Sequence, residues 1–350
     1  MDVEERMRLI ALRPTEEIVT EEELRQLLEA KEHPKAYDGF EPSGYAHIGS
    51  GLQRAIKAKD LIDAGVEFVI LLADWHAYLN NKLGGDMEKI HEAGNYFKKV
   101  WELLGAEDIK IVWASELIER PEYWERFLRI STAVTIDRIK RAGTIMGRKA
   151  VEMQKASFLV YPLMQATDIF ELDVDMCQLG MDQRKVNVLA REVAEKFGWK
   201  KPVLVHHHLL LGLQAGKRMG KEISEEDLKM SKSKPDTAIF VHDSPDEIRR
   251  KMKNAYCPAG VVENNPVIDI VKNLILRGRD DKEVLVVERP EKFGGTVEYY
   301  RYEDLERDFV QGKLHPLDLK NAVAEWLIDV LEPVRNYFEK HGLPEFNVTR

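Results

Sequence analysis

The sequence has few cysteines, no long apolar run and no surplus of positive charge, and each absence excludes a class of protein. Its two cysteines, Cys177 and Cys257, are 80 positions apart, which excludes a disulfide framework and a metal site of the CxxC type. Apolar runs are short, such as residues 68–73, whereas a membrane-spanning helix needs about 20 residues. The acidic N-terminus lacks the apolar segment of a secretory signal. We therefore expect a cytoplasmic protein without a membrane partner.

The balance of charge is acidic, with one local exception. The 350 residues include 52 Lys and Arg against 61 Asp and Glu, a net charge of −9, which argues against a surface covered in nucleic acid. Residues 138–155 differ, because they hold six basic residues and a single acid. These are Arg138, Lys140, Arg141, Arg148, Lys149, Lys155 and Glu152. Such a run is either a solvated helix face or an RNA contact, and charge alone leaves both open.

The chain divides into two regions of different pattern. Up to about residue 210, short β-rich runs alternate with amphipathic stretches, which predicts an α/β fold with a Rossmann-like parallel sheet of five strands. The predicted strands are 36–40, 67–73, 110–114, 175–179 and 203–207, and the predicted helices between them are 48–64, 86–104 and 183–196. Residues 117–158 interrupt this alternation with basic, helical sequence. We interpret them as a helical insertion between two halves of the sheet.

The C-terminal region reads as a separate, mostly helical domain. A capping box runs from Ser244 to Glu247, with Pro245 at the first helical position. It opens a series of predicted helices at 246–254, 266–276, 302–311 and 316–340, with a weak β segment at 283–287. We therefore predict an N-terminal helical segment over 1–34, a nucleotide-binding domain over 35–235 and a C-terminal helical domain over 236–350.

A glycine-rich turn follows the first predicted strand and leads into a helix. Residues 39–51 read Gly-Phe-Glu-Pro-Ser-Gly-Tyr-Ala-His-Ile-Gly-Ser-Gly. A helix start with free amides attracts phosphate, and glycine lets a nucleotide approach the backbone. The dinucleotide pattern lacks its third glycine here, and the Walker A pattern also fails between Gly212 and Lys217. From the residues alone the turn is either a nucleotide site or a structural turn.

A second motif identifies a family. Residues 229–233 read Lys-Met-Ser-Lys-Ser, a pentapeptide expected by chance in a chain of this length with a probability on the order of 10⁻⁴. Together with His47-Ile48-Gly49-Ser50, it resembles the KMSKS and HIGH pair of class I aminoacyl-tRNA synthetases, with Ser50 in place of the second histidine. Over nearly the whole chain the sequence resembles tyrosyl-tRNA synthetases of the archaeal and eukaryotic type. The quoted similarities lie at 37–44, 72–78, 180–185 and 313–321.

The resemblance gives a role to a polar stripe on one predicted helix. Tyr161, Gln165 and Asp168 are spaced i, i+4 and i+7, within an arc of roughly 60° on a helix that is otherwise apolar. From the residues alone this stripe is either a buried structural hydrogen-bond network or the wall of a pocket. The resemblance implies a tyrosine pocket, in which Tyr37 and Asp168 hold the phenol hydroxyl. It also implies that Tyr161, Gln165 and Gln183 hold the ammonium and carboxylate end.

The same resemblance implies an ATP site and a two-step reaction. His47, Lys229 and Lys232 would stabilise the phosphates during adenylate formation, Gly49 would leave room for adenine, and Gly39, Gly180 and Asp182 would complete the nucleotide site. Tyrosine would be activated by ATP and then transferred to the 3′ end of tRNA(Tyr). Mg²⁺ would arrive with ATP, and we expect no organic cofactor and no structural metal. The consecutive histidines 206–208 alternate faces on a strand and are interpreted as pocket-lining residues.

Contacts with tRNA and with a second copy of the chain are further implications. Arg184 and Lys185, with the basic segment, would meet the acceptor stem, while Phe293, His315 and Asp318 would contact the anticodon. Core packing of Phe293 and helix capping by Asp318 are the structural alternatives. The insertion at 117–158 would form a homodimer interface. Three other functions stay open at this point: a tryptophan-specific synthetase, a small-molecule nucleotidylyltransferase and an RNA-binding module without ligase activity.

Overall fold

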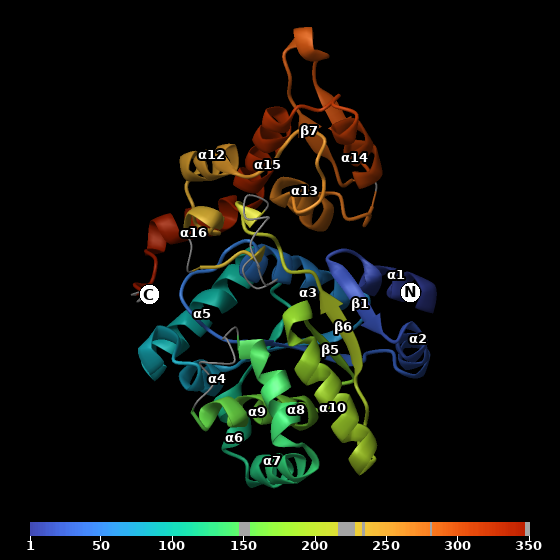
Figure 1. The fold of residues 1–350 in the computed structure, drawn as a ribbon, viewed down its shortest axis with the longest axis vertical. Coiled ribbons are helices and arrows are strands. Elements are labelled where there is room, and N and C mark those ends of the chain that lie inside the picture. Colours follow the sequence, from blue (N-terminus) through green and yellow to red (C-terminus); the bar gives the residue numbers. More distant parts are fainter. Residues whose placement is uncertain (147–154, 216–227, 233–234, 281, 347–350) are drawn as a thin grey trace.

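The computed structural model describes residues 1–146, 155–215, 228–232, 235–280 and 282–346 (Figure 1). A six-stranded sheet forms the centre of the N-terminal region, in the order β1-β6-β5-β2-β3-β4. The strands are β1 (Thr15–Val19), β2 (Lys35–Phe40), β3 (Glu67–Leu72), β4 (Lys110–Trp113), β5 (Met176–Gly180) and β6 (Val203–His207). Strands β2 to β6 run parallel, and β1 pairs antiparallel with β6.

The predicted α/β fold class is confirmed, but the predicted number of strands is wrong by one. The additional strand, β1, lies in the segment over 1–34 that was predicted to be helical, between α1 (Val3–Ala11) and α2 (Glu21–Ala30). Its sequence contains two glutamates and lacks the apolar pattern of a buried strand, so periodicity does not reveal it. As an edge strand it needs little apolar surface, and Glu17 contacts Arg184 and His206 at 2.8 Å each.

The strand residues divide between the two faces of the sheet, and each face has its own helical cover. Alternate residues such as Phe68 and Ile70 enter the core beneath α3 (Arg54–Asp63) and α5 (Met87–Leu103). The opposite set, such as Val69 and Leu71, packs under the second group of helices. That group comprises α6 (Ala114–Ile118), α7 (Pro121–Ala133), α9 (Ser157–Glu171) and α10 (Arg184–Phe197). Two short helices, α4 (Asp74–Leu79) and α8 (Ile136–Ala142), lie beside this cover.

The C-terminal region is built mainly of helices around one small hairpin. Its elements are α12 (Pro245–Asn254), α13 (Pro266–Ile270), β7 (Leu285–Val287), β8 (Val297–Tyr299), α14 (Tyr302–Val310), α15 (Pro316–Val330) and α16 (Glu332–His341). The single helix predicted over 316–340 is in fact two helices, because Pro333 in the first turn of α16 cannot continue α15. Among the described residues, none of the helices has the length and apolar character needed to span a bilayer.

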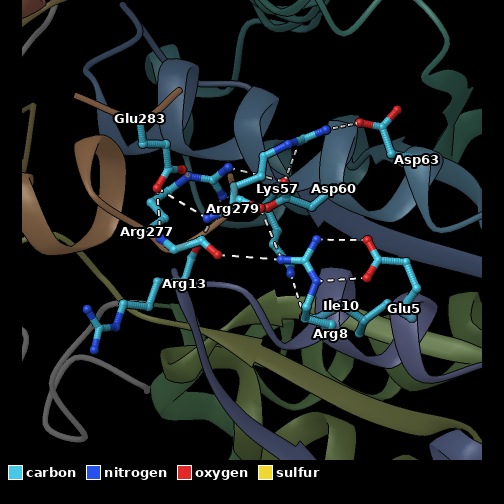
Figure 2. A network of polar contacts seen from close by, with 11 residues as sticks. Glu5, Arg8, Ile10, Arg13, Lys57, Asp60, Asp63, Arg277, Arg279 and Glu283 are labelled. Carbon is cyan, nitrogen blue, oxygen red and sulfur yellow. Dashed lines mark hydrogen bonds and ion pairs between the residues drawn. The ribbon is translucent and has the colours of Figure 1, made fainter. Parts of the chain in front are cut away.

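A buried ion network joins the C-terminal region to the sheet region (Figure 2). Asp60 on α3 is fully buried and pairs with Arg277 at 2.6 Å and with Arg279 at 2.7 Å. Arg277 also donates to the carbonyl oxygen of Arg13 at 2.8 Å. Lys57, one turn before Asp60, donates to the carbonyl oxygen of Ile10, and burial lowers the pKa of its ammonium to about 8. The network around Asp60 therefore connects three segments that are far apart in the sequence: residues 10–13, helix α3 and residues 277–279.

We predict that Asp60→Asn destabilises the protein by about 3 kcal/mol, because it removes the nearer counter-charge of the buried Arg277 guanidinium and leaves only Glu283 at 3.6 Å. Urea unfolding measures this difference in the free energy of unfolding. The matched control is Glu125→Gln, which removes an exposed partner 2.6 Å from Arg129 and should cost below about 1 kcal/mol. Equal losses in the two variants would contradict the role assigned to the network.

Candidate active site

A cavity of about 370 Å³ opens at the carboxyl ends of β2, β5 and β6. The chain passes from β2 to β3 and β4 on one side and returns to β5 and β6 on the other, so the strand order reverses between β2 and β5. Ligands bind at such a point in open parallel sheets. Eleven of the residues predicted for a site line this cavity. They are Tyr37, Gly39, His47, Gly49, Tyr161, Gln165, Asp168, Gly180, Asp182, Gln183 and Lys229.

One end of the cavity is a closed polar floor. Asp168 of α9 is buried, and its Oδ1 accepts a hydrogen bond from the Tyr123 hydroxyl at 2.9 Å. Its Oδ2 lies 3.2 Å from Nε2 of His76 but accepts no hydrogen bond from a described residue. The hydroxyl of Tyr37 is also buried and has no hydrogen-bond partner in the described parts of the chain. Buried polar atoms are rarely left in this state, so the floor is complementary to a polar ligand atom.

The polar stripe on α9 continues from this floor toward the mouth of the cavity. Gln165 donates to Oε1 of Gln183 at 3.1 Å, and the Tyr161 hydroxyl lies 3.4 Å from Oε1 of Glu41. Glu41 also contacts Nζ of Lys82 at 3.2 Å. The sequence reasoning assigned no role to Glu41, although it stands in the glycine-rich turn at the end of β2. Amides and a carboxylate here provide donors and acceptors for a zwitterionic group.

The start of the helix after β2 is held in shape by His47 and Ser50. The His47 amide donates to Oγ of Ser50 at 3.1 Å, and the Gly49 amide donates to Nδ1 of His47 at 3.1 Å. Burial and nearby cations lower the pKa of His47 to about 3, so the ring is neutral and Nε2 carries its proton. A Cβ at Gly49 would lie 3.0 Å from this ring. Ser50 therefore stabilises the turn, and Nε2 of His47 remains a donor.

Two lysines from a distant segment lie at the same edge of the sheet. Residues 228–232 are joined to the segment that follows β6, because the Met230 amide donates to the Leu210 carbonyl at 2.7 Å. Lys229 forms an ion pair with Asp182 at 3.0 Å. Lys232 does not line the cavity; its ammonium donates to the Ser43 carbonyl and lies 4.6 Å from the centre of the Phe97 ring. Burial, followed by the charge of Lys82, lowers the pKa of Lys232 to about 7.

The residues predicted to meet tRNA lie outside the cavity. Arg184 and Lys185 begin α10, and Arg184 pairs with Glu17. Phe293 lies between β7 and β8 with 61% of its surface exposed. The alternative interpretation, that Phe293 packs in the core, is therefore wrong. The N-cap of α15 is His315, whose Nδ1 accepts a hydrogen bond from the Leu317 amide at 3.1 Å. The alternative interpretation of Asp318 as the helix cap is therefore also wrong. Arg148, Lys149 and Ser233 lie outside the described residues.

The three consecutive histidines have separate partners. His206 lies 2.8 Å from Glu17, His207 lies 2.8 Å from Gln178 and lines the cavity, and His208 lies 2.8 Å from Asp269 of α13. Within the described ranges, no three His, Cys, Asp or Glu side chains are grouped to hold a metal ion. These histidines therefore organise the edge of the sheet through hydrogen bonds and ion pairs.

Sequence reasoning missed three residues of the cavity region: His76, Tyr123 and Glu41. His76 follows β3 in a segment that supported the family resemblance, but a single histidine on a short helix carries no spacing signal. Tyr123 lies in α7, 45 residues before Asp168, and only the packing of α7 against α9 brings them together.

Comparison with known proteins places the chain among close relatives. The model of the family described as "tRNA synthetases class I (W and Y)" matches residues 29–332. The chain is 48% identical to the tyrosine–tRNA ligase of Pyrococcus furiosus, covering 98% of this chain and 97% of the relative. It is 52% identical to that of Aeropyrum pernix, covering 96% and 93%. The crystal structure of tyrosyl-tRNA synthetase with L-tyrosine from Pyrococcus horikoshii superposes with a TM-score of 0.90 at 47% identity, covering 97% of both chains.

We predict that binding of inorganic pyrophosphate at about pH 8 is coupled to uptake of about one proton by Lys232. The pKa of the free protein's Lys232 is about 7, and a neighbouring anion raises it, so affinity should fall as pH rises above 7. Calorimetry in buffers of different ionisation enthalpy measures the uptake.

Lys232→Met should abolish the proton uptake. The control is Lys99→Met, which removes another lysine that lies against an aromatic ring, 5.5 Å from the centre of Tyr337. Uptake that persists in the Lys232 variant would contradict this assignment.

Proposed function

The chain belongs to the family of class I tRNA synthetases for tryptophan and tyrosine, and we propose that its cavity performs tyrosine–tRNA ligation with the residues described above. Ligation of tyrosine to tRNA was predicted from the sequence and is confirmed by relatives of nearly full length. L-Tyrosine reacts with ATP to form tyrosyl-adenylate and pyrophosphate. The tyrosyl group then passes to the 3′ end of tRNA(Tyr). We propose that the protein works in the cytoplasm.

The observation that carries tyrosine specificity is the pair of unpartnered atoms on the cavity floor. A phenol hydroxyl would donate to Oδ2 of Asp168 and accept from the hydroxyl of Tyr37, whose pKa burial raises well above its usual value so that it keeps its proton. Phenylalanine would leave both groups buried without a partner. The N–H of tryptophan can donate but not accept, so it would leave Tyr37 unpaired. The floor therefore favours tyrosine over both.

The other end of the amino acid meets the polar stripe. Tyr161, Gln165 and Gln183 are proposed to hold the ammonium and carboxylate, with Glu41 adding a negative charge near the ammonium. This arrangement leaves the carboxylate directed at the nucleotide. The tyrosine carboxylate is already ionised at neutral pH, so its attack on the α-phosphorus of ATP needs positioning and charge stabilisation rather than a general base.

The nucleotide is proposed to occupy the cavity between the two signature segments. Nε2 of His47 would donate to a phosphate oxygen, and Lys229 and Lys232 would neutralise charge as pyrophosphate leaves. When ATP binds, the ammonium of Lys229 would leave its ion pair with Asp182 and pair with a phosphate instead. The Asp182 carboxylate would then be available to the ribose. Gly180 would allow this approach, since a Cβ there would lie 2.7 Å from Oδ1 of Asp182.

The remaining ATP contacts are also part of the proposal. Gly39 and Gly49, at the end of β2 and at the start of the following helix, leave space for the nucleotide. Mg²⁺ would arrive bound to the triphosphate, whose oxygens are the ligands that this ion prefers.

Contacts with tRNA are proposed at both ends of the molecule. Phe293 is exposed and could stack on an anticodon base, with Lys292 4.9 Å from its ring centre. His315 and Asp318 lie in the same region, at the start of α15. Arg184 and Lys185 on α10 would approach the acceptor stem. These contacts distinguish the chain from a small-molecule nucleotidylyltransferase, which has no need of residues 236–350.

A homodimer through the helical insertion is supported by exposed apolar side chains. Trp124 and Leu128 of α7 are 44% and 61% exposed, and Ile136 of α8 is 59% exposed. Three large apolar side chains on adjacent helices favour an interface with another protein surface. We propose that a second copy of the chain covers them.

We predict that Asp168→Ala lowers tyrosine-dependent ATP–pyrophosphate exchange by about 100-fold or more, because it removes the phenol acceptor. Asp318→Ala should leave exchange within about twofold and reduce only the charging of tRNA, since Asp318 lies outside the cavity. Exchange is measured with each amino acid in turn. Exchange with tryptophan but not with tyrosine would reject tyrosine as the substrate. Equal effects of the two variants on exchange would reject the placement of Asp168 in the active site and of Asp318 outside it.

We predict that Phe293→Ala weakens tRNA(Tyr) binding by about 1–3 kcal/mol, the range for one base stacked on an aromatic ring. Filter binding at fixed salt measures the affinity. Val286→Ala is the control, because Val286 is also exposed on the β7–β8 hairpin but has no ring. The stacking role is wrong if the two variants bind tRNA(Tyr) equally well.

A further inference from the structure

The backbone around His47 is held by a later segment of the chain. The Ile48 amide donates to the Ile239 carbonyl oxygen at 2.9 Å, and the Val241 amide donates to the Ala46 carbonyl oxygen at 3.0 Å. These bonds fix the backbone directly before and after His47, whose ring lines the cavity. Any change in this backbone would therefore move the group that we propose as a phosphate donor.

Tyr45, two residues before His47, lies in a cluster of aromatic rings outside the cavity lining. Its ring centre is 4.9 Å from that of His242 and 6.1 Å from that of Tyr96, which belongs to α5. The Tyr96 hydroxyl accepts a hydrogen bond from the Ala46 amide at 3.3 Å. The cluster therefore contacts both of the residues that lead into His47.

Residues 342–346, which follow α16, complete this cluster. The Tyr45 hydroxyl donates to the Pro344 carbonyl oxygen at 2.9 Å. Phe346 is 5% exposed, and its ring centre lies 5.1 Å from that of Tyr45 and 5.7 Å from that of Tyr96. In Figure 1 this segment runs from α16 toward α5. Tyr45 is thus held at its ring and at its hydroxyl by two residues far along the chain.

The contact of Phe346 with the turn differs from a contact that attaches α16 to α5. On α16, the Tyr337 ring lies against Lys99 of α5, with Nζ 5.5 Å from the ring centre. That contact joins two helices, whereas Phe346 reaches a residue of the turn itself. Burial of one aromatic ring against two others favours a single position of Tyr45. Loss of the Phe346 ring would therefore release Tyr45 while α16 stays attached.

We propose that Phe346 is a positioning residue for ATP: its ring and the Pro344 carbonyl hold Tyr45, and Tyr45 fixes the turn from which His47 donates to a phosphate. This inference rests on the proposed function. A site that is ordered before its ligand arrives binds more tightly, because binding does not have to order the turn. The direction of the His47 donor also matters in the transition state. Without the Phe346 ring, the use of ATP would become less efficient, whereas the tyrosine pocket would keep its affinity.

The test is Phe346→Ala in tyrosine-dependent ATP–pyrophosphate exchange, with active sites counted from the tyrosyl-adenylate formed. Counting the sites removes the effect of partial unfolding, which lowers the amount of active protein without changing each site. We expect kcat/KM for ATP per active site to fall by about tenfold, while the dissociation constant for L-tyrosine without ATP stays within about twofold. The matched control is Tyr337→Ala, which removes an aromatic ring of α16 that lies against α5. It should leave both quantities within about twofold.

The outcomes separate this inference from the proposed function. An unaltered protein without tyrosine-dependent exchange would reject the proposed function. An unchanged kcat/KM for ATP in Phe346→Ala, an equal loss of tyrosine affinity, or an equal effect of Tyr337→Ala would reject only the role of Phe346. Should Phe346→Ala fail to fold, Tyr45→Phe decides, because it removes the hydrogen bond to the Pro344 carbonyl and keeps the ring. It should lower kcat/KM for ATP by about threefold, and an unchanged value would overturn the inference.

Discussion

In the function that we propose, specificity depends on a carboxylate held out of water. Asp168 is placed on α9 beneath the sheet edge, where one oxygen is bound by Tyr123 and the other faces the cavity next to Tyr37 and His76. Burial of a charge is unfavourable unless other groups compensate it, and a ligand hydroxyl becomes part of that compensation. The unfavourable burial of Asp168 would thus be offset only by a ligand of the right chemistry, and we propose that the cavity selects tyrosine in this way.

The sheet topology brings the two signature segments together. His47 follows β2 and the lysines follow β6, yet both ends of these parallel strands lie at one edge. Local pairing completes the approach, since His47 forms a bridge with Phe240 and Leu211 forms one with Lys229. The C-terminal region is joined to α3 through the ion pairs of Asp60 with Arg277 and Arg279. The sheet region and the C-terminal region therefore share one hydrophobic core.

Much of this arrangement could be predicted from the sequence, and the exceptions have physical reasons. The buried parallel strands and the polar stripe at Tyr161, Gln165 and Asp168 leave clear periodic signals. The edge strand β1 has no periodic signal, because its glutamates form ion pairs with residues that are distant in the sequence. His76 and Tyr123 reach Asp168 only through tertiary packing, so no local pattern marks them. The hairpin that exposes Phe293 shows why an aromatic residue in a helical region need not belong to its core.

A crystal structure of this protein with L-tyrosine would show which groups the phenol hydroxyl contacts. We expect the phenol oxygen to lie within about 3 Å of both Oδ2 of Asp168 and the hydroxyl of Tyr37, with the carboxylate directed toward His47. A phenol ring that points away from the floor, with Oδ2 of Asp168 still unpartnered, would contradict it.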